Sequence, residues 1–152
     1  MSKFKEVIEK LKAADISVAD FAYEELPCNI EDYPEAVEAQ RIRQEFRDNP
    51  NNKDEKGSWL PGKFDEYRAL PSEYDIAREC LKKSLGLVWK EVAQYGGEGQ
   101  GDTWYSVKYF PDLDLYIKVD GYYQSYCGTE FFGWEQSCSE VRPVEKTITV
   151  YE

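Results

Sequence analysis

The chain contains no histidine, and this absence removes several kinds of active site. Nucleophilic catalysis by a Ser–His or Cys–His pair needs an imidazole as its base, so both schemes are excluded. The cysteines also lack the Cys-x-x-Cys spacing that is typical of metal ligands. They are Cys28, Cys80, Cys127 and Cys138. We therefore expect neither a metal nor another cofactor, and we assign no catalytic residue.

Long apolar runs are missing too. None approaches the ~20 residues that a transmembrane helix requires. Near the start of the chain, Glu6 and Glu9 stand where a signal peptide would be apolar. With neither feature present, we expect a cytoplasmic protein with reduced thiols and no membrane partner.

Basic residues are outnumbered, because 19 Lys and Arg stand against 30 Asp and Glu, for a net charge of -11. Binding to a phosphate backbone depends on Lys and Arg, so this balance argues against direct contact with nucleic acid. It favours a basic protein as the partner. Simple solubility is the alternative explanation of the same charge.

Two motifs that could indicate a ligand site have plainer interpretations. The glycine-rich run at 96–102 lacks the Lys-Ser/Thr of a phosphate-binding loop and precedes a predicted strand, so we interpret it as a hairpin connection. Asp112, Asp114 and Asp120 lack the spacing of a calcium-binding loop, because apolar strand residues separate them. We interpret these acids as residues that flank turns.

The length of 152 residues predicts a single domain over 1–152, mainly helical over 1–86 and an antiparallel sheet over 87–152. Helical spacing and capping residues predict helices over 2–14, 17–26, 32–47 and 72–85. In the third of these, the apolar face would contain Val37, Ala39, Ile42 and Phe46. A long loop at 48–63 would be pinned by Trp59.

After Gly86 the sequence alternates and becomes rich in aromatic and β-branched residues, which is typical of strands. We predict strands near 87–95, 103–110, 115–119, 122–127, 130–134 and 144–151. Asp120-Gly121 would form a two-residue hairpin turn. Short connections imply antiparallel neighbours. The predicted fold class is α+β, with N-terminal helices packed on a C-terminal antiparallel β-meander.

A continuous acidic segment is the first candidate binding feature, because no basic residue occurs between Lys12 and Arg41. A solvated helical face would explain it without any function. As a negative patch, it would attract and hold a basic partner. The candidate residues are Asp20, Glu24, Glu25, Glu31, Asp32 and Glu35.

The aromatic density of the predicted sheet is the second feature. Helices cover only one face of such a sheet, so tyrosines and tryptophans on the other face would serve as interface anchors. The candidates are Tyr116, Tyr122, Tyr123, Tyr126 and Trp134, with an acidic rim at Asp112, Asp114, Asp120, Glu130 and Glu135.

Three stretches carry a resemblance to small accessory proteins of bacteriophages. They read GGEGQGDTWYSVKYF at 96–110, YIKVDGYYQSYCGTEF at 116–131 and EVRPVEKTITVYE at 140–152. The resemblance covers only the C-terminal part of the chain. Some such proteins are acidic mimics of DNA that block host nucleases or defence complexes, and the resemblance implies a role of that kind.

The leading hypothesis is a non-enzymatic protein of a phage or mobile element, acting in the host cytoplasm. It would bind a basic, nucleic-acid-binding protein and inhibit a host defence system in the manner of an anti-CRISPR or DNA mimic. An immunity protein that neutralises a cognate toxin is one alternative. The other is an enzyme with paired carboxylates, which would need a deep pocket and acids of shifted pKa.

Overall fold

The computed structural model describes residues 2–152, and they group into two compact units. The first unit contains the residues up to Glu25 together with Leu87–Glu152, and the second contains Leu26–Gly86. Helices dominate before Gly86 and an antiparallel sheet follows, so the predicted α+β class is confirmed. The length predicts a single domain over 1–152. The division into compact units does not test that prediction, so it stays a prediction.

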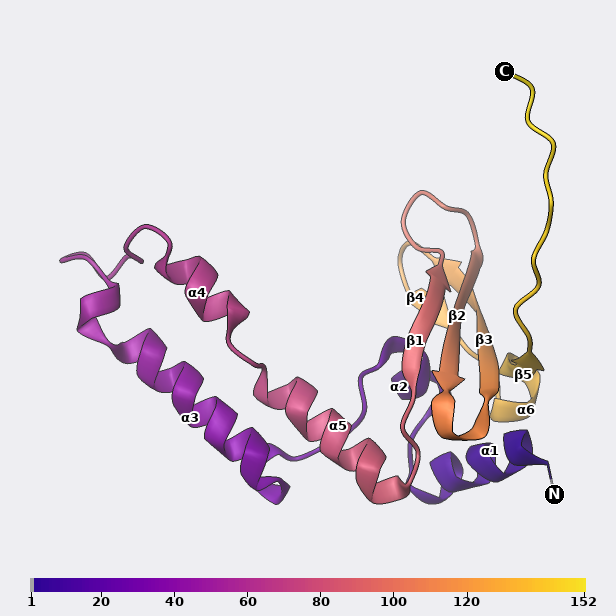
Figure 1. Cartoon of the computed structure of the whole chain (residues 1–152), viewed down its shortest axis with the longest axis horizontal. Coiled ribbons are helices and arrows are strands. Elements are labelled where there is room, and N and C mark those ends of the chain that lie inside the picture. Colours follow the sequence, from indigo (N-terminus) through magenta and orange to yellow (C-terminus); the bar gives the residue numbers. More distant parts are fainter. Residues whose placement is uncertain (1) are drawn as a thin grey trace. The chain divides into compact units, whose positions relative to one another are not determined.

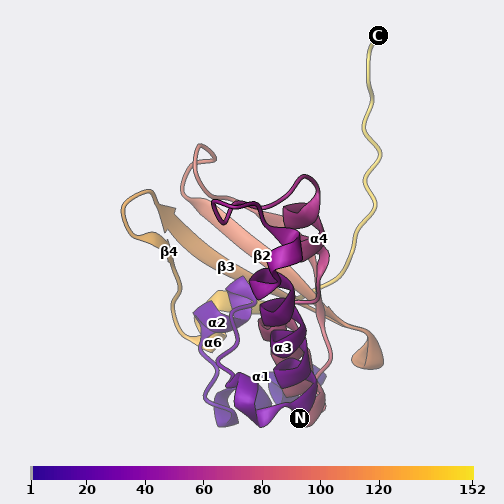
Figure 2. The same ribbon diagram turned by 90° about the vertical axis from the view of Figure 1, so that its left-hand side faces the viewer.

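Five antiparallel strands form the sheet of the first unit (Figure 1). They are β1 (Lys90–Tyr95), β2 (Thr103–Phe110), β3 (Leu115–Gln124), β4 (Gly128–Glu130) and β5 (Cys138–Val141). The first four are neighbours in chain order, and β5 also pairs with β3, opposite residues 116–119. The edge of β3 is therefore shared by β4 and β5. Figure 2 shows the β1–β2 and β3–β4 connections at the same end of the sheet.

Alternation along the strands separates a buried face of the sheet from an open one. In β2, Trp104, Ser106, Lys108 and Phe110 are buried, while the residues between them are half-buried. The helices of this unit are α1 (Lys3–Ala13), α2 (Val18–Tyr23) and α6 (Trp134–Ser137). Phe21 of α2 packs against both the sheet and α6, since its ring lies 5.3 to 6.3 Å from the rings of Trp89, Phe110 and Trp134.

Both predicted helix starts in this unit are confirmed by capping bonds. The Ser2 side chain accepts a hydrogen bond from the Lys5 backbone N–H, which satisfies one of the free donors of α1. At α2, Ser17 and Asp20 form a reciprocal capping box. The helix ends at Tyr23 and is capped by Glu24, whose φ of 59° is in the left-handed region.

Several strand predictions are wrong. Asp120-Gly121 is not a hairpin turn, because all eight residues of β2 pair with residues 115–122 and carry β3 straight through it. The strand predicted at 130–134 ends at Glu130 and is followed by α6. Residues 144–151 form no strand, and the strand near this end is instead β5. Local sequence preference cannot reveal whether a partner strand is present.

The second unit contains α3 (Pro34–Asp48), α4 (Lys63–Ala69), α5 (Glu73–Leu85) and two short 3₁₀ turns, Ile30–Asp32 and Pro50–Asn52. Helices α3 and α5 pack against each other. Between them the Arg43 guanidinium lies 3.2 Å from the Glu73 carboxylate, and it also donates to the backbone carbonyl of Leu70. Helix α4 was not predicted from the sequence.

The buried face of α3 differs from the prediction. Val37 and Ile42 are 43% and 40% exposed, while Ala36 and Ala39 are buried. The small side chains fit the close packing of two helices, whereas β-branched residues would hold them apart. The prediction that Trp59 pins the loop is confirmed, because its ring packs on those of Phe46, Phe64 and Tyr67. Ser72, where the helix predicted over 72–85 would begin, precedes α5 as expected, but its side chain makes no capping bond.

Candidate functional site

The open face of the sheet carries a cluster of tyrosines, which we call the tyrosine face. Its members come from three adjacent strands, and the strand registers place them on the side opposite Trp104 and Phe110. They are Tyr95, Tyr105, Tyr109, Tyr116 and Tyr122. Tyr95 and Tyr122 are 41% and 43% exposed, and the other three are half-buried.

Pairs of rings stack across neighbouring strands of this face. Tyr95 and Tyr105 have centroids 5.7 Å apart with an angle of 21° between ring planes. Tyr109 and Tyr116 lie closer, at 4.4 Å and 26°. The Lys118 ammonium group sits 4.7 Å from the centroid of the Tyr105 ring, in a cation–π contact. These contacts restrict the movement of four of the five rings.

The rim of the tyrosine face is less acidic than predicted, because cations neutralise two of its acids. Asp120 lies 3.5 Å from Lys118, and Asp114 lies 3.4 Å from Arg142. Asp114 also accepts a hydrogen bond of 3.4 Å from the Tyr109 hydroxyl. Desolvation, followed by the charge of Asp114, raises the pKa of Tyr109, so this hydroxyl remains a donor.

The predicted aromatic residues are divided by the structure. Tyr116 and Tyr122 belong to the tyrosine face. Tyr123 points to the other side, where its hydroxyl donates to Glu98 over 2.9 Å, and this bond raises the pKa of Tyr123. Tyr126 is fully exposed in the β3–β4 connection. The prediction of Trp134 as an exposed anchor is wrong, because it is 8% exposed and packs on Phe21.

Tyr95, Tyr105 and Tyr109 complete the tyrosine face but were not among the predicted site residues. The signal that could have identified them was the alternation along residues 103–110. Tyr105 and Tyr109 occupy the positions between the buried residues of β2. Tyr95 could not be found that way, because a β-bulge between Glu91 and Ala93 shifts its register against β2.

The acidic segment divides between the two units. Asp20, Glu24 and Glu25 belong to the first unit, and Glu31, Asp32 and Glu35 belong to the second. Glu25, Glu31, Asp32 and Glu35 are exposed, as a binding role would require. Asp20 instead accepts a hydrogen bond from the Ser17 backbone in the capping box.

Glu24 belongs to a buried network rather than to a free surface. Its carboxylate accepts a hydrogen bond from the Trp89 indole and lies 2.9 Å from the Lys108 ammonium group. Lys108 has no exposed surface, and it also donates to the Ala22 carbonyl at 2.8 Å and pairs with Glu91 at 3.3 Å. The network therefore fastens the end of α2 to the sheet.

This network contains a serine and a lysine, but it is closed to substrates. Ser106 donates a 2.5 Å hydrogen bond to the Glu91 carboxylate that also pairs with Lys108. Both Ser106 and Lys108 are fully buried on the face of the sheet that the helices cover. A substrate could not reach the hydroxyl, so we assign this pair a structural role.

Acid–base chemistry finds little support among the acids whose pKa is displaced. Hydrogen bonds from Arg41 and Lys12 lower the pKa of Glu38 and Glu135 respectively, which is opposite to what a general acid needs. Among residues 2–152, no cluster of three potential ligands could hold a metal ion. That the protein is not an enzyme stays a prediction.

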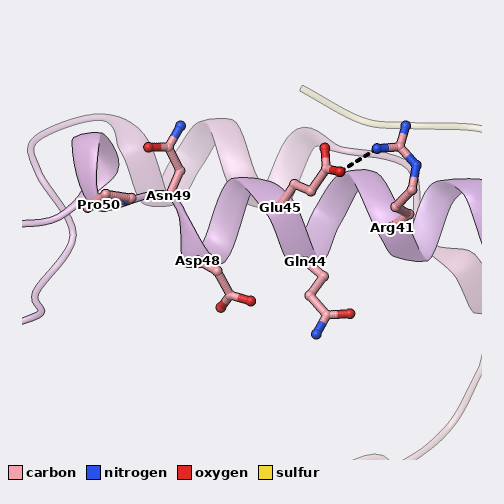
Figure 3. Close-up of a pocket in the computed structure, with 6 residues that line it drawn as sticks. All are labelled: Arg41, Gln44, Glu45, Asp48, Asn49 and Pro50. Carbon is pink, nitrogen blue, oxygen red and sulfur yellow. Dashed lines mark hydrogen bonds and ion pairs between the residues drawn. The ribbon is translucent and has the colours of Figure 1, made fainter.

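A surface hollow lies along α3 (Figure 3). Its residues are Arg41, Gln44, Glu45, Asp48, Asn49 and Pro50. The Arg41 guanidinium is held by Glu38 and Glu45. One of its terminal nitrogens lies 2.5 Å from the Glu38 carboxylate, and the other lies 2.5 Å from the Glu45 carboxylate. Because its charge is already neutralised, the hollow offers no strong attraction for an anion.

Comparison with known proteins adds no assignment to the tyrosine face. The chain matches no protein-family model, no curated protein and no solved structure. Within residues 2–152, no helix has both the length and the apolar character needed to cross a bilayer.

Proposed function

We propose that the protein is a binding module that holds a protein partner on its tyrosine face. The arrangement of five tyrosines on one open face of the sheet carries this proposal. Tyrosine is enriched at protein interfaces, because it buries a large apolar ring and keeps a hydroxyl for hydrogen bonding. Cross-strand stacking fixes four of the rings in advance, which reduces the entropy that binding would cost.

A basic protein is the partner that the charge favours. The net charge of -11 would accelerate the encounter with a positive surface. At the face itself, Lys118 and Arg142 balance Asp120 and Asp114, so close contacts there would be mainly aromatic. Charge would thus control the association rate, and the tyrosines would control the lifetime of the complex.

The biological setting that we propose is inhibition of a host nucleic-acid-binding defence protein by a phage or mobile element. Support comes from the acidic balance and from the resemblance of the C-terminal part to phage accessory proteins. A defence protein that grips nucleic acid has a basic surface, which is the surface that this chain would attract.

Photo-crosslinking tests the binding proposal. A photoreactive phenylalanine analogue replaces Tyr122, and in a control chain it replaces Tyr74, which is 52% exposed in the second unit. Irradiation in a host lysate should join a basic protein to the Tyr122 chain and not to the Tyr74 chain. Unlabelled wild type should compete, whereas a Tyr95→Ser/Tyr122→Ser chain should compete poorly.

Two results would count against this proposal. Equal crosslinking at both positions would show that exposed aromatic groups react without a specific site. Competition by the double variant as strong as that by wild type would remove the tyrosine face from the interface. Rising salt should slow the association, since exposed charges are screened over ~8 Å at physiological ionic strength.

A further inference from the structure

Residues 144–151 have the sequence of a strand but pair with no strand among residues 2–152. Val144, Lys146, Ile148 and Val150 alternate with Glu145, Thr147, Thr149 and Tyr151, so one side of a strand here would carry three apolar side chains and one lysine. Val144, Ile148 and Val150 are 75%, 80% and 70% exposed. Figure 1 shows this segment extended and running away from the sheet after β5.

An exposed segment of this kind presents unpaired backbone groups beside apolar side chains. Threonine, valine, isoleucine and tyrosine all favour the extended conformation, so little conformational freedom is lost when a partner strand is added. Natural sheets usually protect such edges with charge, proline or a covering element. Pro143 stands just before the segment, but no proline interrupts residues 144–151.

A free sheet edge exists in the same chain. Strand β1 pairs with β2 on one side, and none of the strands within residues 2–152 pairs with its other side. All six residues of β1 are exposed, including Val92 at 46% and Tyr95 at 41%. The chain therefore carries both an unpaired strand sequence and an unpaired edge.

We infer that residues 144–151 pair with the β1 edge of a second copy of this chain, and that the exchange is reciprocal. Two identical pairings related by a two-fold axis would satisfy both segments and both edges at once. Main-chain hydrogen bonds would supply the affinity, as in other cases of strand addition. This inference goes beyond the proposed function, because it rests on the main-chain groups of the β1 edge and not on the tyrosine rings, although Tyr95 belongs to both β1 and the tyrosine face.

Local charge favours a second copy over a basic partner for this segment. Residues 144–151 carry one acid and one base, Glu145 and Lys146. Strand β1 is also balanced, with Lys90 and Glu91. The two surfaces can therefore meet without repulsion in a chain whose net charge is -11. A segment designed to bind a basic protein would be expected to share the acidity of the rest.

Pairing with β1 of the same copy is geometrically poor. The segment leaves from β5, which is separated from β1 by β2 and β3. Reaching the free side of β1 crosses four strand spacings, which is about 19 Å and uses about six residues. Arg142 is tied to the Asp114 carbonyl at 2.9 Å, so the crossing would begin there and leave less than half of the segment to pair. A second copy can align with all of it.

Sedimentation equilibrium of the full chain tests the inference directly. We expect a dimer that forms as the protein concentration rises through the micromolar range. A chain that ends at Arg142 should stay monomeric, and Ile148→Asp should weaken the dimer roughly tenfold or more. Thr147→Asp is the matched control, since it adds the same charge to the polar side of the strand and should have a smaller effect.

Hydrogen exchange locates the contact. Amide protons at 90–95 and at 144–151 should become protected together as the dimer forms, and the shortened chain should lose the protection at 90–95. A full chain that stays monomeric overturns the inference. A dimer unaffected by the shortening overturns it as well, and so does protection of 144–151 without any at 90–95.

Discussion

The ammonium group of Lys108 lies 2.9 Å from the carboxylate of Glu24 and ties strand β2 to the residue that caps the end of α2. The lysine side chain has no exposed surface, while that of Glu24 is 28% exposed. A buried ion pair of this kind adds little net stability compared with a well-packed apolar pair, but losing one partner is costly. The contact therefore fixes the position of α2 on the sheet more than it stabilises the fold.

Replacing Lys108 should show that losing one partner of the ion pair costs more stability than the pair itself adds. Lys108→Ala removes the charge and leaves a cavity in the core, so it should lower the free energy of unfolding by about 3–5 kcal/mol. Lys108→Met also removes the charge but keeps most of the volume, so it should cost less, about 1–3 kcal/mol, through the Glu24 and Glu91 carboxylates and the Ala22 carbonyl that lose their partner. Urea unfolding measures both values. Equal losses would mean that packing around the lysine is unimportant.

Charge reversal should affect stability very differently at the two adjacent acids Glu24 and Glu25. Glu24→Lys places a second cation beside Lys108 and should destabilise the fold by about 3 kcal/mol or more. Glu25 is exposed, so Glu25→Lys should change stability by less than about 0.5 kcal/mol. Thermal unfolding of the two variants provides the comparison. Any test of the acidic segment by charge reversal should therefore leave Glu24 unchanged.

Gly121 should tolerate no side chain, because of its neighbours in the sheet. A Cβ atom there would lie 2.4 Å from the Thr129 side chain and 2.7 Å from the Phe131 ring. Gly121→Ala should cost about 1–3 kcal/mol through overpacking. In the background of Phe131→Ala, the same change should cost clearly less. A cost unchanged in that background would mean that the closer contact with Thr129 dominates.

The cysteines should differ in reactivity. Burial, with smaller effects of Asp120 and Glu135, raises the pKa of Cys138 to about 12, whereas Cys127 is exposed. Iodoacetamide at mildly alkaline pH should therefore label Cys127 first and Cys138 last. Mass spectrometry of the peptides measures the order. Early labelling of Cys138 under native conditions would contradict its buried position.

The same thiol gives a pH dependence of stability. Its pKa in the folded state, about 12, lies above the ordinary value of 9.0 expected in the unfolded chain. The contribution of the neutral thiol is fully present below pH 9 and is lost as pH rises from 9.0 toward 12. Cys138→Ala should remove this alkaline component from urea unfolding measured at a series of pH values.

Much of the fold could be predicted from the sequence, because local signals agreed with the tertiary environment. Ser2 and Ser17 marked helix starts through side-chain capping, which depends only on neighbouring residues. The predicted alternation over 103–110 was also confirmed, because a strand with one covered face requires apolar and polar residues to alternate. Tyr116 and Tyr122 were among the predicted anchors, but the strand register was needed to place them on the open face of the sheet.

Other features depended on contacts between distant residues. Asp120-Gly121 has the composition of a hairpin turn, yet pairing with Trp104 and Tyr105 holds it in a continuous strand. Lys108 occupies a buried position that its charge alone would exclude, and only Glu24, Glu91 and the Ala22 carbonyl make that burial acceptable.

The helix starts, the alternation of the strands and the acidic balance depend on residue types and on their spacing along the chain, so they could be predicted without the structure. The accessibility of the aromatic residues depends on packing between distant segments, because Trp134 is covered by Phe21 while Tyr95 and Tyr105 remain on the open face. It also left residues 144–151 unpaired, since strand formation requires a neighbouring edge as well as a strand sequence.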